Sequence, residues 1–136
     1  MSTPFRHPIE IRFADIDAAG HVNNAVYFNY FEQARINWFK QHIGDWDWSE
    51  RGLILVRNEI DYIHPVYLHD NIEVQVRNSR IGTKSFEQLY AVFRKEEGDK
   101  HVLCTRGKSV LVCFNYSLGK SIEIPATWRP ALEPVQ

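Results

Sequence analysis

The feature that most constrains the fold is a long segment, residues 25–42, that is rich in aromatic side chains and holds no glycine or proline. Asn23 and Asn24 suit a helix start, because a short amide side chain accepts hydrogen bonds from the free N–H groups of the first turn. Gly44 follows as a stop signal. At roughly 100° per residue, one face of this helix carries Tyr27, Phe31, Ala34 and Trp38. So wide an apolar face needs a broad partner, and a β-sheet is the natural one.

Much of the remaining chain alternates apolar and polar residues, which is the pattern of half-buried strands. Residues 85–94 and the end of the segment 102–114 are instead apolar on both faces, as expected for strands in the middle of a sheet. We expect strands over residues 8–13, 53–64, 71–80, 85–94 and 102–114. The turns between consecutive strands are short, so the sheet should be antiparallel. In the first strand Ile9, Ile11 and Phe13 should share the buried face, and the residues after Ile124 should form a tail. The sequence therefore predicts one α+β domain, residues 1–136, with one helix and about five strands.

The loop after the helix, residues 44–52, holds Trp46 and Trp48. Two tryptophans in a polar loop suggest a cover over a core or a pocket, or a contact between subunits. Cys104 and Cys113 lie nine residues apart in one predicted strand and so on opposite faces, unless a bulge intervenes. We expect both to be reduced and buried. No His or Cys spacing is typical of a metal site, and we expect neither a metal nor a cofactor.

Composition and charge disfavour several functions. The net charge is −1, whereas a nucleic-acid-binding protein needs a basic surface. No apolar run approaches the ~20 residues of a membrane span, and the N-terminal residues lack the apolar centre of a signal peptide. We therefore expect no nucleic-acid partner, no membrane span and a cytoplasmic location.

The turn before the helix places acidic residues beside a helix N-terminus. Asp15, Asp17 and Gly20 lie where the first strand gives way to the helix. That end of a helix has unpaired backbone N–H groups and the positive end of the helix dipole. Acyl transfer needs this pairing of a base or nucleophile with donors that stabilise an oxyanion.

The run RFADIDAAGHVNNAVYFNYFEQAR, residues 12–35, closely resembles the N-terminal signature of the 4-hydroxybenzoyl-CoA thioesterase family of the hotdog-fold superfamily. The later strand pattern and the length agree, so the resemblance covers nearly the whole chain. It implies a hotdog fold, in which a curved antiparallel sheet wraps one central helix. It also implies subunits that join their sheets edge to edge, as homodimers or homotetramers, and hydrolysis of an acyl-CoA to a free acid and CoA.

The resemblance implies roles for residues of the turn. Asp17 matches the catalytic carboxylate, acting as general base or as nucleophile; the structural alternative is a turn-forming aspartate. The backbone N–H of Asn24 matches the donor that polarises the thioester carbonyl. His21 is a candidate to orient a water or touch the substrate, although the family does not require it. Asp15 is expected to be a turn carboxylate, and Glu32 should pair with Arg35 on the helix surface.

Substrate contacts are implied at two further places. Tyr27 is a candidate to contact the acyl group, which the resemblance places along the aromatic helix at a subunit interface. The segment Thr83-Lys84-Ser85 resembles the family segment that contacts the nucleotide part of CoA, and Lys84 and Ser85 are suitable phosphate ligands.

Two other functions stay open at this point. A hotdog domain can bind acyl groups or acyl-CoA without catalysis. A hotdog enoyl-CoA hydratase also pairs an aspartate with a nearby histidine, as Asp17 and His21 are paired here. The hydratase motif has Asn-Pro between the two and a spacing one residue longer, whereas this chain has Ala18-Ala19-Gly20.

Overall fold

The computed structural model describes residues 4–133. Its strands are β1 (Phe5–Ile9), β2 (Gly52–Tyr62), β3 (Asn71–Ile81), β4 (Ser85–Lys95), β5 (His101–Asn115) and β6 (Lys120–Ser121). Its helices are α1 (Tyr27–His42) and α2 (Arg129–Leu132), and its 3₁₀ turns are η1 (Phe13–Asp15), η2 (Asn24–Val26), η3 (Glu97–Asp99) and η4 (Ala126–Trp128). The predicted helix and the four later predicted strands are confirmed within two residues at their ends.

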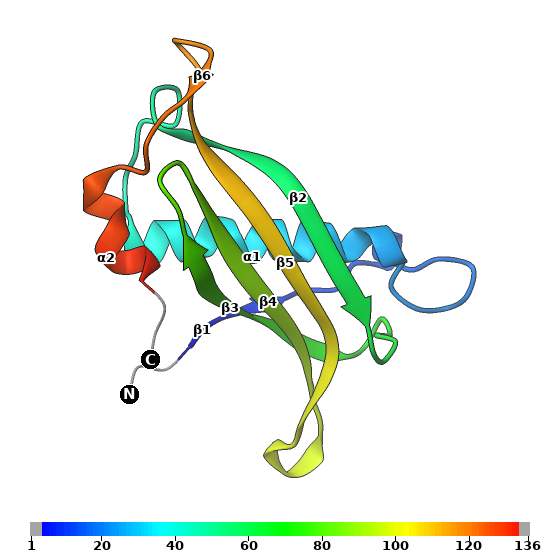
Figure 1. Ribbon diagram of the computed structural model, residues 1–136. Coiled ribbons are helices and arrows are strands. Elements are labelled where there is room, and N and C mark those ends of the chain that lie inside the picture. Colours follow the sequence, from blue (N-terminus) through cyan, green and yellow to red (C-terminus); the bar gives the residue numbers. More distant parts are fainter. Residues whose placement is uncertain (1–3, 134–136) are drawn as a thin grey trace.

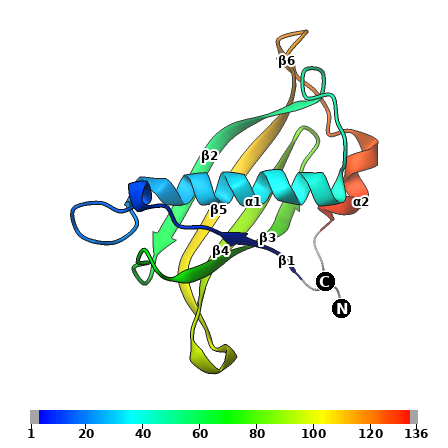
Figure 2. The same cartoon turned by 180° about the vertical axis from the view of Figure 1, so that it is seen from behind.

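In the described part of the chain, six strands form one antiparallel sheet. Their order is β1-β3-β4-β5-β2, and β6 pairs with the end of β5. The sheet curls around α1, which crosses its inner face (Figure 1). Seen from behind, the whole length of α1 lies in front of the strands (Figure 2). This arrangement confirms the α+β architecture expected from the sequence.

The face of α1 that was predicted to be apolar is the face that packs on the sheet. Its buried residues are Tyr27, Phe31, Ala34 and Trp38. The ring of Phe31 stacks on Tyr90 of β4, with 4.6 Å between ring centroids. The same ring occupies the space that a side chain at Gly107 of β5 would need. Because glycine has no Cβ, α1 can lie close to the sheet here.

The first strand lies earlier in the chain than its alternation predicted. β1 ends at Ile9 and pairs with β3 from Phe5↔Val76 to Ile9↔Ile72. Phe13, expected to face inward, is 83% exposed, because the chain turns into η1 and buries Asp15 instead. The expectation of a strand over residues 8–13 is therefore wrong. Pairing with a distant strand, not local alternation, decides where β1 lies.

The expectation of a tail after Ile124 is also wrong as far as residue 133; Pro134 lies outside the described residues. η4 and α2 pack at the C-terminal end of α1, where Trp128 and Leu132 are buried. Trp128 packs against Trp46 at 4.7 Å and against Phe39 at 5.4 Å between ring centroids. The loop with two tryptophans therefore covers the core, which is one of the roles that its sequence indicated.

The two edge strands of this sheet differ in character. β1 has five residues and exposes Arg6 and Pro8, two features that discourage the addition of another strand. β2 has eleven residues and no proline. It exposes Leu55 (42%), Val56 (55%) and Tyr62 (45%). The charged Arg57 and Asp61 are exposed as well, so the apolar part of this edge is its first half. A long edge without proline is the type at which further strands add.

Candidate active site

Asp17 lies in a tight turn directly before α1. Ile16 and Val22 form an antiparallel bridge that closes the turn. Inside it, the Gly20 N–H donates to the Asp17 carbonyl at 2.9 Å. Gly20 has a φ of +88°, a left-handed conformation that glycine adopts without strain. The turn leaves the Asp17 side chain half-buried.

Two donors hold the Asp17 carboxylate. One oxygen accepts from the backbone N–H of Ala19 at 2.9 Å, and the other accepts from the side-chain amide of Asn23 at 3.2 Å. The same Asn23 side chain caps the helix, because its Oδ1 accepts from the Ala25 N–H at 3.0 Å. Asn23 therefore couples the position of the carboxylate to the start of the helix. The sequence indicated the cap but not the bond to Asp17.

Asn24 is the first residue of η2, which continues directly into α1. Its backbone N–H makes no hydrogen bond within residues 4–133, as is usual in the first turn of a helix. Its carbonyl accepts from the Tyr62 hydroxyl at 2.6 Å, which ties the helix start to the end of β2. The free N–H lies at the positive end of the helix dipole and is available to an oxygen that gains negative charge.

Asp15 has a different environment from Asp17, although only one residue separates them. It is 1% exposed and accepts from the Arg12 N–H at 3.0 Å, the Arg12 guanidinium at 2.9 Å and the Tyr30 hydroxyl at 2.7 Å. Burial raises the pKa of Asp15, but these hydrogen bonds outweigh burial and hold the pKa below its usual value. Asp15 thus fastens the turn to α1, and its side chain is closed to a ligand.

Comparison with known proteins places this fold and turn in a family. The sequence profile of the Thioesterase-like superfamily matches residues 11–132. The chain belongs to this superfamily. A Thermus thermophilus thioesterase, whose crystal structure contains coenzyme A and zinc, is 34% identical, with a TM-score of 0.78 over 93% of this chain and 90% of that one. A 1,4-dihydroxy-2-naphthoyl-CoA hydrolase of Gloeothece citriformis is 29% identical over 114 residues, 77% of this chain and 75% of the relative.

The fold itself is confirmed by a solved thioesterase. A variant of 4-hydroxybenzoyl-CoA thioesterase complexed with 4-hydroxybenzoyl-CoA has a TM-score of 0.86 at 20% identity, over 97% of this chain and all of that one. The protein thus has the hotdog fold that the resemblance in residues 12–35 implied, and the superfamily to which it belongs identifies it as a thioesterase.

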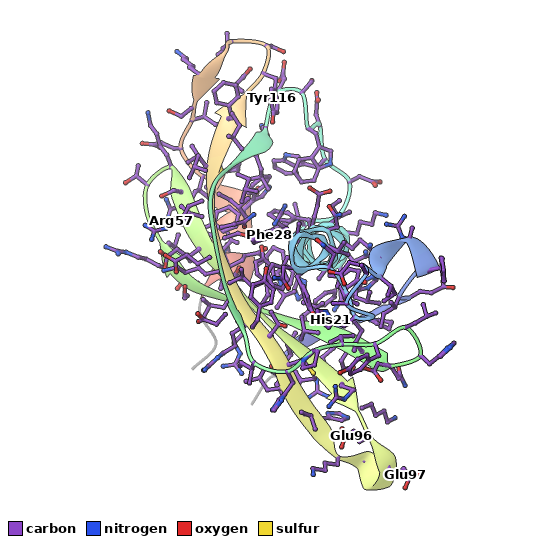
Figure 3. All side chains as sticks on the ribbon, turned by 90° about the vertical axis from the view of Figure 1, so that its right-hand side faces the viewer. His21, Phe28, Arg57, Glu96, Glu97 and Tyr116 are labelled. Atoms are coloured by element: carbon purple, nitrogen blue, oxygen red, sulfur yellow. The ribbon has the colours of Figure 1, made fainter. Side chains whose placement is uncertain are left out.

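His21 and Tyr27 of this thioesterase lie beside the turn. His21 is half-buried and lies below the N-terminal end of α1 in the view of Figure 3. Its ring packs edge-on against Tyr67 at 6.4 Å between ring centroids. Tyr27 is 2% exposed and packs against Tyr62 at 5.4 Å. Burial raises the pKa of Tyr27 to about 12, so the phenol is neutral and supports the helix start from within the core. Contact of either residue with a substrate stays a prediction.

Lys84 and Ser85 lie at the opposite end of the thioesterase from Asp17. Lys84 is exposed in the β3–β4 turn, and its carbonyl accepts from the Cys113 N–H at 2.8 Å. This turn lies near α2, whereas Asp17 precedes the other end of α1 (Figure 1). α1 has 16 residues and is therefore about 24 Å long. Within one chain, the structure does not bring Lys84 and Ser85 together with Asp17.

The main hollow beside α1 is also remote from Asp17. Its volume is about 540 Å³, and it opens between the second half of α1, the tryptophan loop and the start of β2. A hollow of about 630 Å³ lies against β2, β3, β4 and β5, and a smaller one lies beside β1. None of these three is lined by Asp17, His21 or Asn24.

Other chemistry finds little support in residues 4–133. No group of three His, Cys, Asp or Glu side chains is placed to hold a metal ion, and none of the helices has the length and apolar character to cross a membrane. Cys104 and Cys113 are free and buried, as predicted, with Cys104 in a β-bulge opposite β4. Burial raises the pKa of both thiols, that of Cys113 to about 12, and a neutral thiol is a poor nucleophile.

Proposed function

We propose that this thioesterase hydrolyses an acyl-CoA thioester to a free acid and CoA, with Asp17 as the catalytic carboxylate and the Asn24 N–H as the oxyanion donor. The observation that carries the proposal is the link between the turn of Asp17 and the helix start that follows it. The Asn23 side chain joins Asp17 to the helix start, where the Asn24 N–H is free. The superfamily match and relatives named as acyl-CoA hydrolases support the choice of substrate.

Asp17 can act in either of two ways. As a general base, it takes a proton from a water whose oxygen bonds to the thioester carbon, and the C–S bond then breaks to release the thiolate of CoA. As a nucleophile, a carboxylate oxygen bonds to that carbon and displaces the thiolate, and water hydrolyses the resulting mixed anhydride. In both routes the Asn24 N–H stabilises the charge that develops on the carbonyl oxygen. His21 is assigned to orient the water.

We further infer that the working unit is a homodimer in which two β2 edges pair. If the protein is a homotetramer, it would contain two such pairs. β2 is the long edge of the sheet and has no proline, whereas Arg6 and Pro8 protect β1. A pair of identical edges that meet across a twofold axis must run antiparallel. Pairing would also cover the exposed Leu55 and Val56.

Antiparallel pairing would bring the N-terminal end of α1 in one copy close to the C-terminal end of α1 in the other. β2 begins at Gly52, which lines the main hollow, and ends at Tyr62, which binds the Asn24 carbonyl. The Gly52 end of one copy would therefore lie beside the Tyr62 end of the other. The Lys84 turn is at the Gly52 end, since Lys84 bonds to Cys113 and Cys113 pairs with Leu53. Asp17 of one copy would then face the hollow and the CoA-binding lysine of the second copy.

The substitution Asp17→Asn tests the assignment. It keeps the size of the side chain and removes the base or nucleophile, so kcat for a panel of aliphatic and aromatic acyl-CoAs should fall by roughly 10²–10⁴-fold. Release of CoA thiol is the measurement. Asp99→Asn, in the exposed β4–β5 turn, is the matched control and should leave the rate unchanged. Unchanged thiol release in Asp17→Asn would refute the role of Asp17.

A wild-type protein that binds acyl-CoA without thiol release on any substrate would instead identify a binding module. Loss of enoyl absorbance without thiol release would identify a hydratase. Either result would remove the hydrolase proposal.

A further inference from the structure

A buried arginine lines the main hollow beside α1. Arg35 is 8% exposed, although the sequence placed it in a surface pair with Glu32. The hollow around it is largely aromatic and aliphatic, with Phe39, Trp46, Trp48, Leu53 and Tyr116 among its lining residues, and its charged lining residues besides Arg35 are Glu32, Lys40 and Asp45. Viewed along α1, Tyr116 lies at the upper end of the sheet, above the helix (Figure 3). A permanent positive charge therefore lies in a mostly apolar space.

The charge of Arg35 is only partly compensated. Its Nη1 donates to the Tyr90 hydroxyl at 2.9 Å, which is a neutral partner. The Glu32 carboxylate lies 3.8 Å from Nη2, and its side chain is 60% exposed to water. A guanidinium has five N–H donors, and burial of a charge is unfavourable unless it is paired and fully hydrogen-bonded. The remaining capacity of this group suits a planar anion.

The guanidinium is also held in position from the sheet. Tyr90, which accepts from Arg35, donates to the buried Gln88 at 3.3 Å. The Tyr90 ring is fixed by its stacking on Phe31. A donor group that is already ordered loses little freedom when a ligand binds. The arrangement is that of a built anion site rather than a mobile surface arginine.

We propose that Arg35 binds the distal carboxylate of the acyl group, so that the preferred substrates are CoA monothioesters of dicarboxylic acids. The aromatic walls of the hollow would contact the methylene chain, and the guanidinium would bind the free carboxylate at its far end. The inference rests on the proposed function, because the thioester end must reach Asp17 of the second copy. Gly52 and Leu53 line the hollow and lie at the edge where that copy would pair.

The kinetic test compares suberyl-CoA with octanoyl-CoA, which differ only in the terminal carboxylate. Wild type should favour suberyl-CoA in kcat/KM by about tenfold or more, the usual value of a charge-assisted hydrogen bond. Arg35→Gln should abolish the preference while it keeps hydrolysis of octanoyl-CoA. Lys40→Gln, which removes an exposed cation from the same hollow, is the control and should keep the preference. Equal rates on both substrates in wild type would overturn the inference.

A binding measurement separates this inference from the proposed function. Trp46 and Trp48 line the hollow, so titration with monomethyl suberate should change tryptophan fluorescence at lower concentration than titration with methyl octanoate, which has no carboxylate. Arg35→Gln should remove this difference, and Arg35→Lys covers the case in which the glutamine variant does not fold. Arg35-dependent binding of monomethyl suberate without hydrolysis of any acyl-CoA would sink the proposed function but keep the ligand class. Hydrolysis of acyl-CoA without selective binding of monomethyl suberate would keep the proposed function and overturn the ligand class.

Discussion

The two ends of α1 differ in what they would offer a substrate under the proposed function. At the N-terminal end lie a half-buried carboxylate, Asp17, and the free N–H of Asn24, yet none of the three hollows touches them. At the C-terminal end, a hollow of about 540 Å³ contains a buried guanidinium and lies on the side of the Lys84 turn. The reactive groups and the binding volume are separated by the length of the helix.

We propose that a second copy of the chain brings the two ends together, because one chain alone keeps the Asp17 turn and the main hollow apart. β2 runs from one end to the other and exposes a long edge without proline. A substitution can therefore either prevent the pairing of two copies or alter one end of α1 alone.

Disconnecting the ends should have the largest effect. Val56 is 55% exposed at the centre of β2, and Val56→Lys puts a charge where the two edges would pair. We expect monomers in size-exclusion chromatography and a loss of roughly 10³-fold in kcat/KM, because positioned groups are no longer brought together. Pro8→Lys places the same charge on the opposite edge, β1, and should change neither the oligomeric state nor kcat/KM. A fully active monomer would disprove the shared site.

Removing one N–H tests the N-terminal end alone. Asn24→Pro deletes the oxyanion donor, and proline is tolerated at a first helical position. The preceding Asn23 already has φ −61° and ψ 140°, which a following proline requires. We expect kcat to fall by roughly 10²-fold, while Asn24→Ala keeps most of the activity because the N–H is main chain. Equal rates in the two variants would exclude Asn24 as the donor.

A smaller effect is expected from Asn23→Asp. The new side chain can still cap the helix through an oxygen, but it replaces the N–H donor to Asp17 with a second carboxylate about 3.2 Å away. Repulsion between the two should displace Asp17 and lower kcat by roughly tenfold. Circular dichroism should show an unchanged fold. If Asn23→Ala and Asn23→Asp have the same rate as wild type, the coupling between cap and carboxylate has no role in catalysis.

The smallest effect concerns the anchor of the turn. The folded pKa of Asp15 is below its unfolded value, so its stabilisation is present above about pH 4 and is lost as the pH falls through the folded pKa. Asp15→Asn should lower the free energy of unfolding by about 2 kcal/mol at neutral pH. The difference from wild type should shrink below about pH 4 in urea titrations. Asp99→Asn should show no such pH dependence, and a constant difference for Asp15→Asn would contradict the assignment.

The sequence predicted the elements whose signal is local. The aromatic face of α1 and the alternation in β3 appear in the structure almost residue for residue, and β4 and β5 begin and end within one residue of their predicted bounds. The failures involve distant contacts. Phe13 continues an apolar alternation, but the bonds from Arg12 and Tyr30 to Asp15 turn the chain away. Trp128 is buried only because Trp46 and Phe39 lie beside it.

The candidate site shows the same limit. The turn with Asp17 and the helix start with Asn24 are adjacent in sequence, so their proximity could be inferred. Arg35 and Glu32 have the spacing of a surface pair, and only the sheet residue Tyr90 reveals that the guanidinium is buried. The resemblance implies a role for both Lys84 and Asp17, whereas in one chain the turn that contains Lys84 and the turn that contains Asp17 lie at opposite ends of α1 (Figure 1).

The Tyr62 hydroxyl has a consequence for how quaternary structure and rate are related. It bonds to the carbonyl of Asn24 at 2.6 Å, and it belongs to the strand whose edge is open. If β2 moved, the Tyr62 side chain would move with it and displace Asn24, the residue whose N–H is the proposed oxyanion donor. Dissociation would then misalign the catalytic amide as well as remove the neighbour's groups. Activity per subunit should accordingly decline on dilution well before any subunit unfolds.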